Sequence, residues 1–201
     1  MTSPGGDPTK RCLHLFLPIQ LVALAAPVAL AGLDPDMDSM GIWLDAAGNS
    51  NCFVDASFTP FTTYLLLSHP AGPTGGFACR VSLVGAPYFI LATDLRGGAD
   101  IDASAEGFLV GRSSPYPVVG DQIVLATFQV MLQAYAQLEF YVRPPVPPYG
   151  TCPGPVVFGD GTTRCCGVSS GDVNLPVATV NGTCPVDEES LSFGAIKGLY
   201  R

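Results

Sequence analysis

Four aspartates near the start of the chain have a spacing that could bind calcium. Asp34, Asp36, Asp38 and Asp45 stand at positions 1, 3, 5 and 12 of one stretch, as the acidic ligands of a calcium loop do. Ser39 occupies position 6, where such a loop needs glycine, and Asp45 replaces the usual bidentate glutamate. We therefore expect an acidic linker, residues 32–40, with no bound metal or other cofactor, and keep these aspartates as a calcium candidate.

Side chains that hydrolytic enzymes use are present but form no motif. His69 is the one histidine outside the segment predicted below to be a leader, and no Gly-x-Ser-x-Gly sequence accompanies it. Asp100, Asp102 and Glu106 belong to an acid-rich loop, yet nothing singles out two carboxylates at glycosidase spacing. We predict no catalytic residues, with a small secreted hydrolase using loop carboxylates as an alternative.

Residues 1–31 have the pattern of a secretory signal peptide. Lys10 and Arg11 precede an apolar run from Leu15 to Leu30, and the small residues Ala29 and Ala31 suit signal peptidase cleavage before Gly32. Prolines within the run disfavour the alternative of a retained membrane anchor. We predict a secreted or cell-surface protein, with no transmembrane segment after leader removal.

Cleavage would leave six of the seven cysteines, an even number that favours disulfides in an exported chain. We expect Cys52 to pair with Cys79, and Cys184 to pair with one cysteine of the 152–166 loop. The neighbours Cys165 and Cys166 should not pair with each other. The predicted disulfide cysteines are Cys52, Cys79, Cys152, Cys165, Cys166 and Cys184.

Net charge excludes one class of partner. The chain of 201 residues carries 9 Lys and Arg against 17 Asp and Glu, a net charge of −8. Nucleic acid affinity comes mainly from clustered basic residues, so we expect no nucleic acid partner.

The pattern of the rest of the chain predicts β-strands. The 23 glycines and 19 prolines disfavour helices, and apolar residues alternate with polar ones between turn sequences. In Phe77–Leu83 this alternation places Arg80 and Ser82 outside with Ala78; in Leu138–Arg143 it places Glu139, Tyr141 and Arg143 outside. Nine strands are expected, at residues 41–45, 61–67, 77–83, 88–95, 107–112, 123–132, 138–143, 156–158 and 175–180.

These strands predict an all-β fold, a two-sheet antiparallel sandwich at residues 41–185. The pattern of Tyr64–Leu67, Gly76–Val81 and Ile123–Val130 resembles cohesin-type and immunoglobulin-like sandwiches of secreted bacterial proteins. Residues 41–45 and 175–184, with the ending 192–201, resemble an uncharacterised family of exported bacterial proteins. This resemblance implies fold and export, and it implies no active site.

Residues 186–201 are predicted to form a C-terminal tail after an acidic spacer, either a sorting signal or a frayed terminus. Our leading hypothesis is a non-catalytic binding or structural module whose partner is a protein or a glycan at the cell surface. The alternative is self-association, in which Gly32–Met40 or the tail adds as a strand to a neighbour in an extracellular polymer.

Overall fold

The computed structural model describes residues 33–102, 104 and 106–185, and the predicted leader and tail lie outside this range. The described residues form thirteen strands and no helix. This part of the chain therefore contains no helix that could cross a membrane. The strands are β1 (Ser39–Trp43), β2 (Cys52–Phe53), β3 (Pro60–Ser68), β4 (Gly76–Gly85), β5 (Tyr88–Asp94), β6 (Ala99–Asp100), β7 (Gly107–Gly111), β8 (Gln122–Leu132), β9 (Leu138–Arg143), β10 (Val156–Gly159), β11 (Thr162–Cys165), β12 (Gly167–Val168) and β13 (Ala178–Val180).

All nine predicted strands have a counterpart, and the ends of all but β9 are shifted. The four additional strands, β2, β6, β11 and β12, are two to four residues long, which is too short for an alternating pattern to reveal them. The segment 175–177 precedes β13 instead of belonging to it. The proline-rich segment 144–148 is a connection between β9 and β10.

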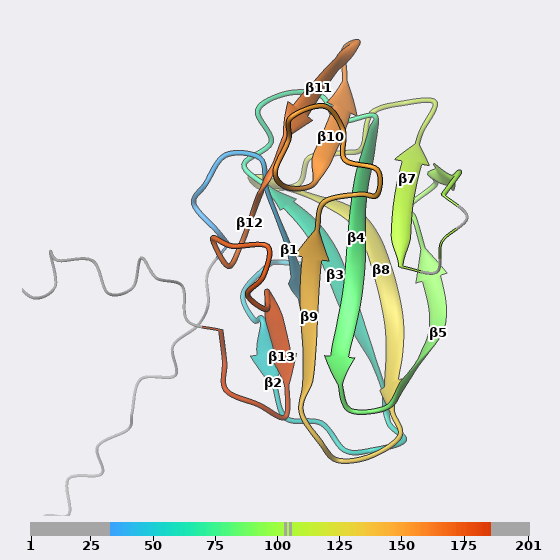
Figure 1. Ribbon diagram of the computed structural model, residues 1–201, viewed down its shortest axis with the longest axis vertical. Helices are drawn as coiled ribbons and strands as arrows, with labels where there is room; N and C mark the ends of the chain where they lie inside the picture. The colour runs from blue at the N-terminus through green and yellow to red at the C-terminus, as the bar shows by residue number, and fades with distance from the viewer. Residues whose placement is uncertain (1–32, 103, 105, 186–201) are drawn as a thin grey trace, which may run out of the picture.

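Two sheets form the sandwich (Figure 1). Sheet A has the order β12-β1-β3-β8-β5, and sheet B has the order β11-β10-β4-β9-β13-β2, with β7 on the other side of β4 and paired with β6. Most pairs are antiparallel, but β1 pairs with β12, and β13 with β2, in parallel. The predicted two-sheet sandwich is confirmed, and its sheets are mixed because short terminal strands join them in parallel.

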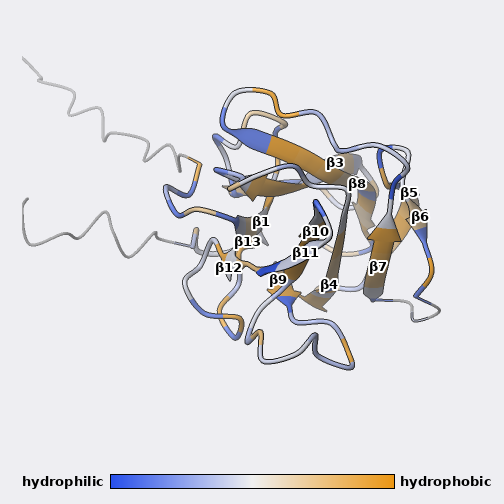
Figure 2. Cartoon of the chain, turned by 90° about the horizontal axis from the view of Figure 1, so that it is seen from above, coloured by the Kyte–Doolittle hydropathy of each residue, from blue (hydrophilic) through white to orange (hydrophobic). Residues whose placement is uncertain are grey.

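The core lies between the sheets. Figure 2 shows β3 and β8 in one layer and β4 and β9 in the other. Leu65, Phe77, Leu125 and Phe140 are among the fully enclosed side chains between them. Trp43 of β1 is buried as well, with 2% of its surface exposed.

The N-terminal segment is part of the sandwich, whereas the sequence predicted a linker up to residue 40. Ser39 and Met40 are fully buried in β1, where Met40 pairs with Leu67. Asp38 is also buried, because it bonds the turn after β3 and an arginine of β11.

Candidate binding surface

The outer face of sheet B carries polar side chains in a row across β4 and β9. In β9, Leu138, Phe140 and Val142 are buried while the residues between them are partly exposed, as predicted. In β4, Arg80 is partly exposed as predicted. Ala78 is fully buried instead, because β7 and β10 flank this part of β4 on both sides.

Two arginines oppose each other on this face. Arg80 and Arg143 are direct partners in the β4–β9 register. Both Nε atoms are shielded from solvent without a hydrogen-bond partner, and neither guanidinium forms an ion pair with the described residues. Like charges placed directly opposite on neighbouring strands destabilise a sheet, and no ion pair with the described residues offsets the two charges here.

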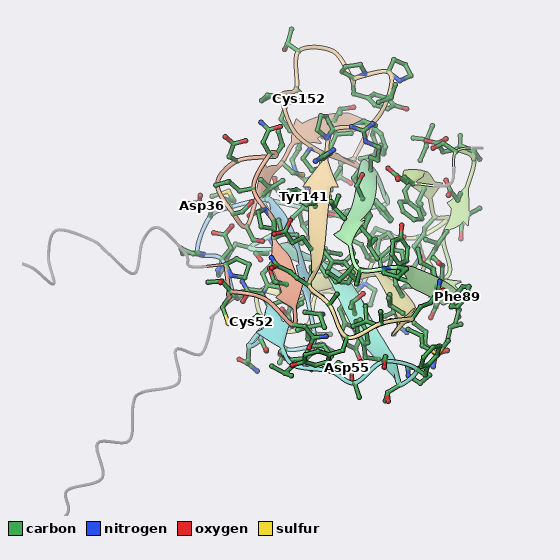
Figure 3. All side chains as sticks on the ribbon, turned by 60° about the horizontal axis from the view of Figure 1, so that its bottom comes forward. Asp36, Cys52, Asp55, Phe89, Tyr141 and Cys152 are labelled. Atoms are coloured by element: carbon green, nitrogen blue, oxygen red, sulfur yellow. A yellow bond between two sulfur atoms is a disulfide. The ribbon has the colours of Figure 1, made fainter. Side chains whose placement is uncertain are left out.

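Tyr141 lies beside the arginine pair and is labelled on β9 in Figure 3. Its hydroxyl donates to Glu139 Oε2 at 2.7 Å, and the Arg143 guanidinium stands 4.8 Å from its ring centroid. The hydrogen bond to Glu139, and secondarily burial, raise the pKa of Tyr141. On the β4 side, Ser82 Oγ donates to Glu106 Oε2 at 2.8 Å. We call Arg80, Arg143 and Tyr141 the arginine face.

Two hollows lie elsewhere. One of about 340 Å³ adjoins Glu139 and is bounded by Gln137, Leu175 and Pro176. Another, of about 560 Å³, is lined by Arg96 and Arg112 at the end of sheet A. Its guanidiniums are already engaged. Arg96 Nη1 lies 3.3 Å from Asp94 Oδ2, and Arg112 stacks 4.5 Å from the centroid of Tyr116, whose burial raises its pKa to about 12.

The four aspartates of the calcium candidate are not brought together. Asp34 accepts from the Ser39 hydroxyl, Asp38 binds Arg164 Nε at 2.8 Å, and Asp45 accepts from the amides of the turn at residues 47–49. Asp36 is exposed, and Figure 3 labels it. Among the described residues, no three His, Cys, Asp or Glu side chains cluster as a metal site requires.

Two disulfides are formed. Cys52 joins Cys184, and Cys152 joins Cys165. By the chain-entropy model, closing loops of 132 and 13 residues contributes about 5 and about 3 kcal/mol. The expected pairing of Cys184 with the 152–166 loop is therefore wrong.

The expected Cys52–Cys79 pair is also wrong. Cys79 faces the core from β4, and β9 and β13 separate β4 from β2, so three strand spacings of about 4.8 Å exceed disulfide reach. Cys79 and Cys166 are buried free thiols. Both belong to the buried core cluster between the sheets, and no bridge joins them.

The carboxylates of Asp100, Asp102 and Glu106 accept hydrogen bonds from backbone amides or a hydroxyl group instead of facing one another. Asp100 Oδ1 accepts from the amides of Asp102 and Leu109, at 3.0 and 2.9 Å, and Asp102 Oδ1 accepts from the amide of Ser104 at 2.8 Å. His69 adopts a positive φ of 43° in the turn after β3, where its amide donates to the Asp121 carbonyl.

Sequence reasoning placed Arg80, Tyr141 and Arg143 outside but missed that the arginines oppose each other. The pairing of residues 63 positions apart depends on the β4–β9 register, which no local pattern encodes. The signal available was two outward arginines among only nine basic residues.

No protein-family model and no curated protein sequence matches the chain. Two solved structures are similar in fold, both from Acetivibrio cellulolyticus. One is the type II cohesin dyad of the adaptor ScaA scaffoldin, with a TM-score of 0.49 and 13% identity over 73% of this chain and 49% of that chain. The other is the sixth cohesin of scaffoldin B in complex with a mutant Cel5 dockerin, with a TM-score of 0.45 and 13% identity over 72% of this chain and 98% of that chain.

The chain thus spans about half the length of the first structure. Both likenesses concern the fold alone.

Proposed function

We propose that this protein is a secreted or cell-surface, non-catalytic binding module whose arginine face receives carboxylates of a protein partner. The observation that supports this most is the opposed pair Arg80 and Arg143, whose Nε donors are shielded yet unpartnered. An incoming carboxylate would neutralise two like charges at once. Charge-assisted hydrogen bonds of this kind are stronger than neutral ones.

The composition of the face favours a protein over a glycan. Arginine and tyrosine are enriched in protein interfaces, and a flat sheet face suits an extended partner. Tyr141 is poorly placed to stack on a sugar, because Arg143 covers its ring and Glu139 holds its hydroxyl. The charge is local, since the chain as a whole carries −8.

Two features support export. The predicted leader precedes the described domain, and both disulfides belong to a class of bond that persists in oxidising compartments. The two disulfides also anchor β2 and β11, which are short strands with few backbone hydrogen bonds of their own.

The alternatives receive less support. A hydrolase would need two carboxylates facing a common point, whereas Asp100, Asp102 and Glu106 each hold a separate partner. A polymer built by donating Gly32–Met40 would have to pull Ser39 and Met40 out of β1. Donation of the tail concerns residues outside the described part of the chain.

The experiment is a binding titration of the full exported protein with hexaglutamate and, separately, with hexagalacturonate at low ionic strength. Replacing both arginines, Arg80→Gln with Arg143→Gln, should weaken hexaglutamate binding at least about tenfold, because each charge-assisted bond contributes about 1.5 kcal/mol or more. The matched control is Arg96→Gln with Arg112→Gln, which removes two arginines that already contact Asp94 and Tyr116 and should leave affinity unchanged.

Three other results would each contradict part of the proposal. Binding of the galacturonate alone would replace the protein partner with a glycan. If the control and the Arg80/Arg143 double variant lost the same affinity for hexaglutamate, the effect would come from net charge and not from the arginine face. Failure of both probes to bind would remove the arginine face as a carboxylate site.

A further inference from the structure

The described part of the chain ends beside β9. Pro185, its last residue, lines the hollow of about 340 Å³ together with Glu139 of β9 and Thr179 of β13. Figure 1 shows that the chain turns back after β13 and runs in the same direction as β9. The residues that follow Pro185 therefore start next to the strand that carries half of the arginine pair.

The arginine face lies within reach of this end of the chain. Glu139, Tyr141 and Arg143 alternate with buried residues of β9 and share its outer face. Arg143 is four residues from Glu139, or about 14 Å along the strand, and Arg80 lies directly opposite Arg143. An extended chain advances about 3.4 Å per residue, so the fourth residue after Pro185 can lie level with Arg143.

The residues at this distance are acidic. Asp187, Glu188 and Glu189 follow Pro185 by two to four positions, outside the described part of the chain, and we call them the acidic spacer. Their carboxylates complement the two guanidiniums of the arginine face, which form no ion pair with the described residues. Glu139 carries a like charge beside the hollow, so repulsion favours the spacer carboxylates at the arginine end of β9.

We propose that the acidic spacer covers the arginine face of the same molecule when no partner is bound, so that a partner must displace it. This inference rests on the proposed function, because it concerns the same two arginines. A short tether gives the spacer an effective concentration in the millimolar range, at which weak contacts between opposite charges are populated. The spacer carboxylates would also offset the repulsion between Arg80 and Arg143 in the unbound protein. A successful partner would present an acidic segment longer than the spacer.

The test compares the full exported protein with a variant whose spacer is neutral, Asp187→Asn with Glu188→Gln and Glu189→Gln. Both are titrated with hexaglutamate at about 0.1 M salt, where charges more than about 10 Å apart are largely screened. The neutral spacer should tighten hexaglutamate binding at least about threefold. A competitor that covers about two thirds of the molecules reduces the apparent affinity by that factor.

A matched control separates the spacer from net charge. It also removes three negative charges, from exposed aspartates that lie on neither β4 nor β9: Asp36→Asn, Asp121→Asn and Asp160→Asn. This control should bind hexaglutamate with the affinity of the unmodified protein.

The arginine variant supplies a second control. In the protein with Arg80→Gln and Arg143→Gln, neutralising the spacer should leave hexaglutamate affinity unchanged, because the spacer then covers no arginine pair. A double-mutant cycle of this kind isolates the coupling between the spacer and the two arginines.

The possible failures of this inference and of the proposed function differ. If hexaglutamate bound through Arg80 and Arg143 equally well before and after neutralisation of the spacer, the inference would be overturned and the proposed function would stand. An equal gain in the aspartate control would assign the effect to net charge. A gain that depended on protein concentration would place the spacer on a second molecule. Absence of hexaglutamate binding to both proteins would reject the proposed function, and this inference with it.

Discussion

Arg80 and Arg143 show how a residue's role depends on its neighbour across the sheet. Each alone would be an ordinary outward arginine on a strand. Opposed to each other, with Nε atoms shielded and unpartnered, they place two like charges side by side, which destabilises the sheet.

Cys79 and Cys166 should be unreactive toward alkylating reagents in the native protein. Burial is the main cause that raises the pKa of both thiols, for Cys166 to about 12 from an ordinary value near 9, with Asp38 adding to the shift. The thiolate is the reactive form, so raising the pKa suppresses alkylation at pH values where an exposed thiol would already react. Iodoacetamide at pH 9 should label no cysteine in the folded exported protein, from which the leader with Cys12 is removed, and two after unfolding in urea, as counted by mass spectrometry.

Peptide mapping of the same samples distinguishes the thiols from the bridges. The two labels should lie on Cys79 and Cys166, with Cys52–Cys184 and Cys152–Cys165 still joined. Labelling of the native protein, or no labelling after unfolding, would contradict this assignment of the cysteines.

At the scale of elements, a partly buried ion pair joins three segments. Arg164 of β11 binds Asp38, which precedes β1, and its guanidinium also donates to the Gly72 and Pro73 carbonyls of the β3–β4 loop. Arg164→Met should lower the free energy of unfolding by about 3 kcal/mol, because Asp38 would be left buried without its partner. Urea denaturation measures this change.

The control for that prediction is Arg96→Met. Its ion pair with Asp94 has side chains 50% and 58% exposed, and such pairs contribute at most about 1 kcal/mol. The account fails if both variants lose the same stability. Recovery of part of the loss by Asp38→Asn in the Arg164→Met background would identify the orphaned carboxylate as the cause.

The strands were predictable where alternation is long, and the contacts between strands were not. Leu138–Arg143 alternates over its whole length, so both its bounds and its two faces could be read from the sequence. The disulfide partner of Cys52 could not, because it depends on β13 lying next to β2 in the sheet order. Asp38 appeared to belong to a linker because its arginine partner is 126 positions away.

At the scale of the whole molecule, the arginine face is a local exception to the overall charge. The chain carries a net charge of −8, whereas Arg80 and Arg143 oppose each other on the outer face of sheet B.

The most direct test of the arginine face is an NMR titration that follows the arginine Nε–H resonances of the full exported protein as hexaglutamate is added. The account predicts that the signals of Arg80 and Arg143 shift together and saturate, while those of Arg96 and Arg112 stay in place. Unchanged Arg80 and Arg143 signals, or equal shifts at all four arginines, would contradict it.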